Sequence, residues 1–492
     1  MRAIAKRGGG LAEAILPSWL AWLAYAALPA SAHADEPVAA TEPRLMSETA
    51  EVTSVVDAFD KDDPFDLNIT LGFEQTWKHA DIRRETTLNQ PGLSSGGFTA
   101  QTGNVATYNQ QISTLNVGAD VGIYRDLALI ARLPIILQNA QSLGDLDGSS
   151  NNPQRLFDSN GQPIFSIPKG GSFQSPTRSG VDWFSVGIDW AIFNQQRDLT
   201  KPTWVVGVEG RFGVGTPLHA CNATSGTNVC PDPAHPTVAA DYRSPGISRA
   251  MDGVAAHTVF SRRFGYVEPY SGFSMLAEFP QSGSDFGATS GFQGDLVNHP
   301  PLVGNFSLGM EVIPWERREQ FQRFVVDFRA IGTYHSEGRD YTELFDALGS
   351  TTSQILRTPN PGGYHAGPNG TSVADPSQGS VYFTGITDQL PYASIGGRFS
   401  TTWQAGEYIK FVAGAAMTYN QSHVITADQA CNPSVTNDPA AAGPCHSGSG
   451  AGSTATGIPN PNYRPTLDVP GNRFLVDDAA IVSLWLNGVV MF

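Results

Sequence analysis

The sequence predicts an all-β protein: a transmembrane, antiparallel, up-and-down β-barrel of about twelve strands. Three observations lead to this prediction. Apolar and polar residues alternate along many segments, the connections between these segments alternate between short and long, and the segments are long enough to cross a bilayer. The three observations are independent of one another, and they agree.

The alternation has a period of two residues, which is the period of a β-strand, whereas a helix repeats every 3.6 residues. It is clear at 115–123 and again in the final segment 481–492, IVSLWLNGVVMF. The alternating stretches lie at 67–73, 115–123, 127–137, 184–192, 204–212, 254–260, 273–279, 306–312, 324–330, 395–399, 409–417 and 482–492. Each stretch is therefore predicted to be a strand with one apolar face.

The connections fall into two length classes that alternate along the chain. The short ones are 125–126, about 194–202, 262–265, about 314–321 and 404–407. The long ones are about 79–107, 139–180, 216–247, 280–302, 336–390 and 421–479. This order predicts short periplasmic turns at one end of a barrel, long extracellular loops at the other, and both termini on the short-turn side.

Strand length and aromatic positions also fit a bilayer. A strand of twelve to fourteen residues, tilted by about 40–45°, gains roughly 30 Å of height. Aromatic residues occur near the predicted strand ends, where a membrane interface favours them: Trp77, Tyr108, Trp204, Tyr266, Trp315, Trp403, Tyr408, Tyr419 and Phe492. A soluble β-sandwich is the alternative, but its strands are shorter and its connections do not sort by end.

The N-terminus predicts export. Residues 1–34 combine a basic start, an apolar run and the sequence Ala32-His33-Ala34, which favours a cleaved signal peptide over an uncleaved transmembrane helix. Residues 35–65 follow as an acidic periplasmic segment with nine acids, and 66–492 form the predicted outer-membrane barrel domain.

Within the acidic segment, four apolar residues have helical spacing: Val52, Val55, Val56 and Phe59. They predict a short amphipathic helix that begins near Ser47. Two interpretations of the segment stay open. It is either a largely disordered periplasmic tail or a small plug that lays its apolar face against the mouth of the barrel.

Composition narrows the class of function. Removing the signal peptide changes the net charge from −16 to −18, which argues against nucleic acid as a partner. Charged residues make up only 15% of the chain and glycine accounts for 52 residues, which suits strands and polar loops better than a soluble enzyme.

The four cysteines form two close pairs in predicted long loops, Cys221 with Cys230 and Cys431 with Cys445. Since an exported chain meets an oxidising compartment, two disulfides are expected. The spacing lacks the C-x₂-C pattern of zinc sites. We expect no metal and no cofactor.

The chain end also resembles a known family. A terminal aromatic residue after alternating apolar residues is similar to the assembly signal of Gram-negative outer-membrane β-barrels of the porin and small-transporter type; the matching residues are Leu484, Leu486, Val490 and Phe492. The resemblance covers about 66–492 and identifies no subfamily. It implies a place in the outer membrane of a Gram-negative bacterium, with outer-membrane lipids and the outer-membrane assembly machinery as partners.

If the apolar faces meet lipid, the opposite positions face the lumen. The charged residues at these positions are Glu74, Asp120, Arg132, Asp189, Glu209, Arg211, Glu268, Glu311, Arg323, Asp327, Arg329, Arg398 and Lys410. Their charges either line a narrow pore for small polar solutes or form ion-pair ladders in a closed lumen. The first account predicts a narrow porin-like channel; the alternative is a structural or surface-interaction barrel whose outer loops bind partners.

We predict no enzymatic activity. Some twelve-stranded outer-membrane barrels are phospholipases with a Ser–His pair two residues apart on one strand face. Here the nearest match is His335-Ser336, and adjacent strand residues point to opposite faces. A lipid hydrolase is therefore the least favoured function.

Two long loops carry weaker signals. In 139–180 the oxygen ligands Asp145, Asp147 and Asn151 suggest calcium, but Leu156 stands where a calcium-binding loop needs Glu, which favours a solvated loop. In 336–390 the stretch 341–348, YTELFDAL, predicts a short helix. It either folds into the lumen and narrows it or packs inside its own loop.

Overall fold

The computed structural model describes residues 50–59, 66–87, 100–146, 156–366, 372–434, 445–447, 454–455 and 457–492. The chain divides into two units, 1–44 and 45–492. The predicted signal peptide at 1–34 and most of the acidic segment at 35–65 lie outside the described residues. Within the described part, no helix is long and apolar enough to cross a membrane.

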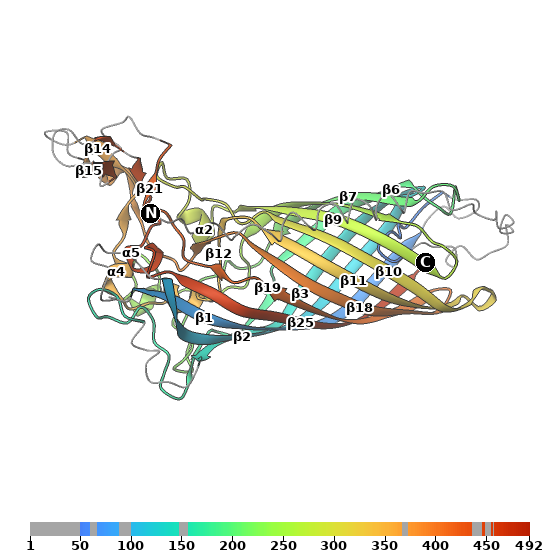
Figure 1. The fold of residues 1–492 in the computed structure, drawn as a ribbon, viewed down its shortest axis with the longest axis horizontal. Helices are drawn as coiled ribbons and strands as arrows, with labels where there is room; N and C mark the ends of the chain where they lie inside the picture. The colour runs from blue at the N-terminus through green and yellow to red at the C-terminus, as the bar shows by residue number, and fades with distance from the viewer. Residues whose placement is uncertain are drawn as a thin grey trace, which may run out of the picture. The chain divides into compact units, whose positions relative to one another are not determined.

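Twelve long strands within the described ranges form one closed antiparallel barrel (Figure 1). They are β1 Leu67–Thr87, β2 Ala100–Tyr124, β3 Leu127–Asp145, β6 Trp183–Phe193, β7 Thr203–Gly213, β8 Met251–Ser261, β9 Val267–Pro280, β10 Val303–Arg317, β11 Gln322–His335, β18 Tyr392–Gly406, β19 Ile409–Asn420 and β25 Phe474–Met491. Each strand pairs with the one before it, and β25 also pairs with β1. The predicted fold is confirmed.

The last residue of the chain completes the barrel. The Phe492 N–H donates to the Leu67 carbonyl oxygen (2.9 Å), and the Leu67 N–H donates to the Phe492 carbonyl oxygen (3.2 Å). Along the same seam, Phe73 faces Leu486. Because the first and last strands pair, the barrel has no open sheet edge that would need covering within a bilayer.

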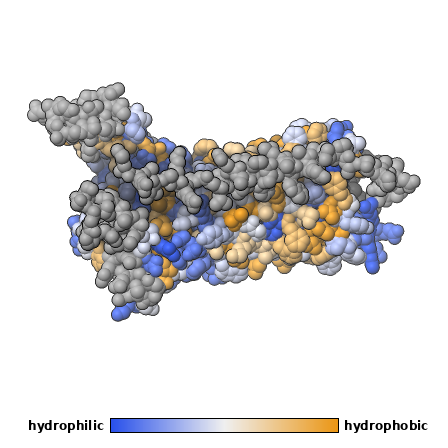
Figure 2. All heavy atoms as spheres, viewed as in Figure 1, coloured by the Kyte–Doolittle hydropathy of each residue, from blue (hydrophilic) through white to orange (hydrophobic). Residues whose placement is uncertain are grey.

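The outer face of the barrel is apolar. Leu486 is 58% exposed and Ile395 is 71% exposed, and both point away from the lumen. On the face visible in Figure 2, hydrophobic residues gather along the barrel wall, and hydrophilic residues gather at the right-hand end, where the short turns lie. Such a belt of exposed apolar side chains on a closed barrel is a lipid-facing surface, so the barrel spans a membrane. The residues of the predicted assembly signal, Leu484, Leu486, Val490 and Phe492, all lie on it.

Several strands run beyond the predicted membrane span. β1 continues to Thr87, β2 already begins at Ala100, β3 continues to Asp145 and β25 begins at Phe474. The prediction of loop at 79–87, 100–107, 139–145 and 474–479 is therefore wrong. In these extensions backbone pairing continues without the apolar alternation that marks a lipid-facing strand in the sequence.

The connections at the long-loop end contain many small elements. Paired short strands are β12 Gly338–Asp340 with β17 Thr387–Gln389, β13 Asn360–Pro361 with β16 Ser380–Val381, β14 Tyr364–Ala366 with β15 Ser372–Ala374, β21 Cys431–Asn432 with β24 Ile458–Pro459, and β22 His446–Ser447 with β23 Thr454–Ala455. Strands β4 Ser172–Gln174 and β5 Arg178–Val181 pair with β3, and β20 His423–Val424 pairs with β25. The α-helices are α2 Asp285–Ala288, α3 Phe345–Gly349, α4 Gln354–Arg357 and α5 Pro465–Asp468. Two 3₁₀ turns, Ala239–Asp241 and Pro376–Gln378, lie in the long loops, and a third, Arg318–Gln320, lies in a short turn. We call the long-loop elements together the cap.

The cap has an apolar core of its own. One cluster joins Leu344, Leu348 and Leu467 of the cap to inward-facing residues of the barrel wall such as Ile82 and Val476. A second, smaller cluster surrounds Phe286, Phe345 and Ile386. The predicted helix at 341–348 is present in shorter form as α3, and its apolar face packs into these clusters. The cap is thus packed against the inner wall at the mouth of the barrel.

The prediction that Tyr108 lies in an aromatic belt at the membrane interface is wrong. Tyr108 is only 3% exposed and belongs to the larger cap cluster, so it does not lie in an outer aromatic belt. It faces inward beside Ala80 on β1, at a height where the inner wall meets apolar cap residues and not water. Trp315, Trp403 and Tyr408 lie exposed on the outside, as predicted.

Candidate functional site: the charged lumen

The barrel encloses a polar cavity of about 580 Å³. Its volume falls in the range of roughly 300–1,000 Å³ that is typical of small-molecule pockets. Of the charged residues predicted to face the lumen, those that line it are Asp120, Arg132, Asp189, Glu311, Asp327, Arg329, Arg398 and Lys410. The cavity wall therefore presents both signs of charge to whatever fills it.

The other five predicted residues lie around this cavity without lining it. Glu74 accepts a hydrogen bond from Asn116, which does line the cavity (3.5 Å). Glu209 pairs with Arg211 two residues along the same strand (3.1 Å). Glu268 and Arg323 are almost fully buried, and the Glu268 carboxylate accepts a hydrogen bond from Ser261 (2.7 Å).

Residues 50–59 occupy the lumen near the short turns; we call this segment the plug. Its polar contacts reach several strands. The Glu51 carboxylate pairs with Lys410 of β19 (2.8 Å), the Glu51 N–H donates to Glu311 of β10 (2.9 Å), and Thr53 shares a hydrogen bond with Ser261 of β8 (2.8 Å). Val52, Val55 and Val56 line the floor of the cavity.

The plug does not contain the predicted helix within 50–59. The described residues form a turn and then an isolated bridge, in which Ala58 and Arg125 exchange backbone hydrogen bonds (3.0 and 2.8 Å). Phe59 is exposed and does not join the valines on one face. The backbone groups of the plug bind to the barrel wall, so the segment gains these bonds without forming helical ones.

Several lumenal charges lie next to a basic or acidic neighbour on another strand. Asp120 forms an ion pair with Arg132 on β3. Asp189 faces His257 of β8, whose Nε2 lies 3.3 Å from the carboxylate. His257 was not among the predicted residues, although it stands at an inward position of a weakly alternating strand.

A second group of lumenal residues combines arginines with aromatic rings. The Arg329 Nε donates to the Tyr270 hydroxyl (2.7 Å), and that hydroxyl donates to Asp327 (2.5 Å). The Arg398 guanidinium lies over the Trp485 ring, 4.1 Å from its centroid. The two-residue alternation could have identified Tyr270 and Trp485 as inward-facing, because each alternates with lipid-facing neighbours. They were not predicted, since only charged residues were considered as lumenal.

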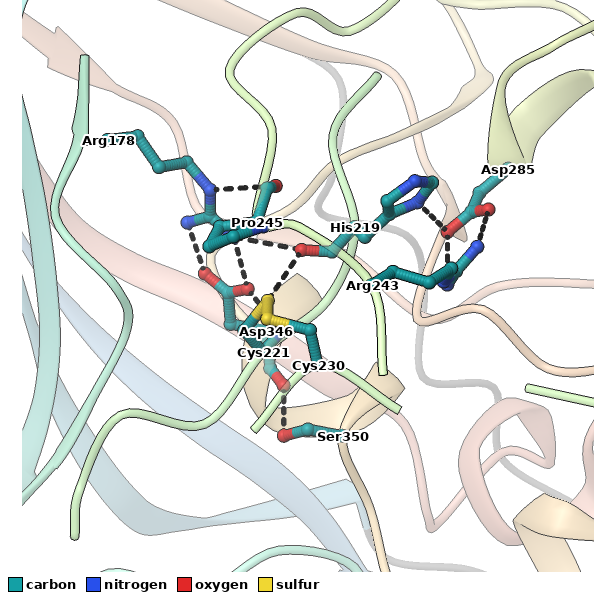
Figure 3. The surroundings of a disulfide bond; sticks show 9 residues. All are labelled: Arg178, His219, Cys221, Cys230, Arg243, Pro245, Asp285, Asp346 and Ser350. Carbon is teal, nitrogen blue, oxygen red and sulfur yellow. Dashed lines mark hydrogen bonds and ion pairs between the residues drawn. A yellow bond between two sulfur atoms is a disulfide. The ribbon is translucent and has the colours of Figure 1, made fainter. Parts of the chain in front are cut away.

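The cap is fastened by a disulfide and buried ion pairs (Figure 3). Both predicted disulfides are present, Cys221–Cys230 and Cys431–Cys445. In Figure 3, Asp346 at the start of α3 receives two hydrogen bonds from the Arg178 guanidinium (2.8 and 2.7 Å) and one from the Cys221 N–H (2.9 Å). These bonds connect the loop closed by the Cys221–Cys230 disulfide to α3, which packs at the mouth of the barrel.

A second ion cluster in Figure 3 holds α2. Asp285 accepts hydrogen bonds from Arg243 (2.7 and 3.0 Å) and lies 3.1 Å from His219 Nδ1. Burial by itself raises the pKa of Asp285, but the hydrogen bonds from His219 and Arg243 bring it below its ordinary value. Asp285 is therefore ionised and helps to fix the cap at neutral pH.

The geometry does not pair His335 with Ser336. His335 stacks on Tyr392, with ring centroids 4.3 Å apart, and Tyr392 stacks in turn on His423 at 3.8 Å. The Ser336 hydroxyl donates to the Glu337 carbonyl oxygen (3.0 Å) and accepts from the Leu302 N–H (2.8 Å). These contacts do not form the Ser–His arrangement that a lipid hydrolase needs.

The calcium signal is only partly within the described residues. Asp145 ends β3, whereas Asp147 and Asn151 lie outside the described ranges. In the part of the chain that the structure describes, no group of three or more His, Cys, Asp or Glu side chains is arranged to hold a metal ion.

Neither protein-family models nor curated protein sequences match the chain. Distant likenesses occur among solved structures. A FadL homologue from Pseudomonas aeruginosa is 10% identical (TM-score 0.28; 87% of this chain, 90% of that chain). The toluene transporter TodX from P. putida is 9% identical (TM-score 0.27; 91% and 93%), and the outer membrane protease OmpT from Escherichia coli is 7% identical (TM-score 0.26; 86% and 97%). At these scores the likenesses assign no activity; the closed barrel and its apolar outer face are what make this chain a barrel protein of the outer-membrane kind.

Proposed function

We propose that the protein is a narrow, gated channel in the outer membrane of a Gram-negative bacterium and that it passes small polar solutes. The polar cavity inside the barrel carries this proposal. It offers about 580 Å³ lined by charges of both signs, whereas a purely structural barrel would gain stability from a filled, dry interior.

The plug is the proposed gate. Within 50–59 it is held by a small number of polar contacts, of which the Glu51–Lys410 ion pair links it to β19 and the Ala58–Arg125 bridge links it to the β2–β3 turn. When the plug leaves the lumen, both charges of this largely buried pair regain water, which offsets much of the lost attraction, so the plug can leave without unfolding the barrel. In this orientation the short turns and the plug face the periplasm.

Single-channel recording in planar lipid bilayers tests the proposal. The protein that starts at residue 35 is expected to give stepwise currents with long closed periods. Replacing Lys410 with Met removes the partner of Glu51 and should raise the open fraction several-fold, because an unpaired carboxylate is poorly tolerated in the lumen. Lys201→Met is the matched control, since Lys201 is exposed on a short turn, pairs with Asp198 and does not line the cavity.

The same recording on a variant that lacks the plug can contradict the proposed channel. If a variant without residues 35–59 is folded and inserted but carries no current, the cap closes the lumen by itself. The packed cap core, with its buried Arg178–Asp346 pair and two disulfides, favours that second candidate: a closed barrel whose outer loops bind a partner.

A further inference from the structure

Two arginines face each other on the inner wall of the barrel. Arg329 of β11 and Arg398 of β18 are direct register partners, and both line the lumenal cavity. Like charges that lie directly opposite on neighbouring strands destabilise a sheet. Their presence at one position of the cavity wall therefore needs a compensating charge.

Among the described residues, only one of the two arginines forms an ion pair with an acid of the wall. Arg329 Nη2 lies 3.4 Å from Asp327, and the same carboxylate also accepts from Tyr270. Among the described residues, Arg398 forms no ion pair, and its Nε has no hydrogen-bond partner. Asp327 and Glu74 both act on Arg398 electrostatically, but among the described residues neither forms an ion pair with it, so its guanidinium has no contacting acid.

Aromatic rings hold the two guanidinium groups in place. The Cζ of Arg398 lies 4.1 Å from the centroid of Trp485, and that of Arg329 lies 5.2 Å from the centroid of Tyr270. Stacking on a ring restrains a guanidinium while its N–H groups stay free in the plane to bind an anion. Arg329 is also held by Asp327, whereas Arg398 rests on its ring without an ion pair among the described residues.

The rings themselves depend on glycines. Trp485 lies against Gly414 and Tyr270 lies against Gly309, so closely that a Cβ at either glycine would collide with the ring. Both arginine–aromatic pairs therefore follow one plan: an inward glycine, a ring laid over it and a guanidinium against the ring. Two such units meet at the Arg329–Arg398 contact.

We propose that Arg329 and Arg398 form a binding subsite for the carboxylate of a small organic solute, which rests on the proposed function of the lumen as a solute path. A carboxylate accepts two parallel hydrogen bonds from a guanidinium fork. It would also supply the contacting acid that Arg398 lacks among the described residues.

Propionate and its uncharged isostere propionamide are suitable probes. Saturation-transfer NMR on the protein from residue 35 onward, in detergent micelles, measures binding of each without requiring transport. We expect saturable binding of propionate and at least tenfold weaker binding of propionamide, since a hydrogen bond to a charged group contributes about that factor. Arg398→Gln should weaken propionate binding at least tenfold, and Arg398→Lys should retain part of it.

Arg317→Gln is the matched control, because Arg317 also rests on a tryptophan, Trp315, but at an exposed position outside the lumen. Circular dichroism confirms that each variant keeps the barrel. Equal binding of propionate and propionamide, or unchanged binding in Arg398→Gln, overturns the subsite. A protein that conducts without preferring propionate contradicts the subsite alone, and one that binds propionate without conducting contradicts the channel alone.

Discussion

Single residues on the inner wall decide how much of the lumen is open. Trp485 is large and nearly buried, yet it fits inside the barrel because Gly414 on the neighbouring strand has no side chain. The ring then supports Arg398 and keeps its guanidinium against the wall. A glycine within a strand usually weakens it, but here it provides the close approach that the ring requires.

Gly414→Ala is expected to lower the free energy of unfolding by about 1–3 kcal/mol, because the added methyl group collides with the Trp485 ring and forces it to move. Urea unfolding in lipid vesicles, followed by tryptophan fluorescence, measures this change. Gly304→Ala is the control, since no atom lies within 4 Å of the position its Cβ would take. Equal stability of the two variants would show that the ring moves without cost.

The two-residue alternation in the sequence identified the charged residues that face the lumen, but it did not identify the residues with which they pair. Asp120 and Arg132 were predicted from alternation within their own strands, and both line the cavity. The pairing of Asp189 with His257 depends on two strands that are not neighbours along the sheet, β6 and β8. Alternation gives the face of a residue, whereas this contact depends on the register of three strands, in which Gly207 of β7 lies between Asp189 and His257 and leaves room for it.

Among the small elements of the cap, the β12–β17 pair carries a buried charge. Asp388 of β17 is the register partner of Arg339 of β12, yet Arg339 directs its guanidinium to Asp428 at 3.4 Å. Burial, together with the negative charges of Asp428 and Glu337, raises the pKa of Asp388 to about 9. Asp388 therefore keeps its proton at neutral pH in the folded cap.

This raised pKa makes the cap sensitive to base. The unfolded carboxyl group ionises near pH 4 and the folded one near pH 9, so the folded cap holds the extra proton between these values. Local stability is then complete below about pH 4 and falls as pH rises towards 9, by up to about 1.4 kcal/mol per pH unit. Asp388→Asn should remove this slope and stabilise the cap at pH 8 by about 1–3 kcal/mol.

Hydrogen exchange at the Ala427 amide reports on this element, because that N–H donates to the Asp388 carbonyl oxygen (3.0 Å). Protection factors between pH 6 and 8.5, corrected for intrinsic exchange, should fall in the wild type and stay level in Asp388→Asn. Asp375→Asn, in the same loop but exposed to solvent, should keep the wild-type slope. A level wild-type profile would mean that Asp388 is ionised.

At the scale of the whole molecule, the lumen balances acids against bases, and its selectivity should follow that balance. Replacing Arg323, Arg329 and Arg398 together with Gln leaves the acids in clear excess. If the lumen conducts, its ion preference should shift towards cations, because the local potential becomes negative. The reversal potential in a potassium chloride gradient measures this shift.

A matched triple variant controls for overall charge. Lys201, Arg317 and Arg318 lie on the short turns, outside the cavity lining, and replacing them with Gln removes the same number of positive charges. The control should keep the wild-type reversal potential. An unchanged reversal potential in the lumenal variant would mean that these arginines do not set selectivity.

The amino-acid sequence by itself determined the closed barrel, its strand order and its outer face. Lipid on one side and a polar lumen on the other force a two-residue alternation, and that pattern is local enough to read in any one strand. The two disulfides were also predicted, from the close spacing of the cysteines and the predicted export of the chain.

Only the tertiary structure decided what fills the two ends of the lumen. The plug is held by Glu51 and Lys410, which are 359 residues apart, and the cap by Arg178 and Asp346, which are 168 apart. No periodicity links such partners, since they meet only after the barrel closes and brings distant segments into one lumen. The arginine pair at 329 and 398 belongs here too, because its proposed role depends on register, on two supporting rings and on the absence of an ion pair to Arg398 in the described residues.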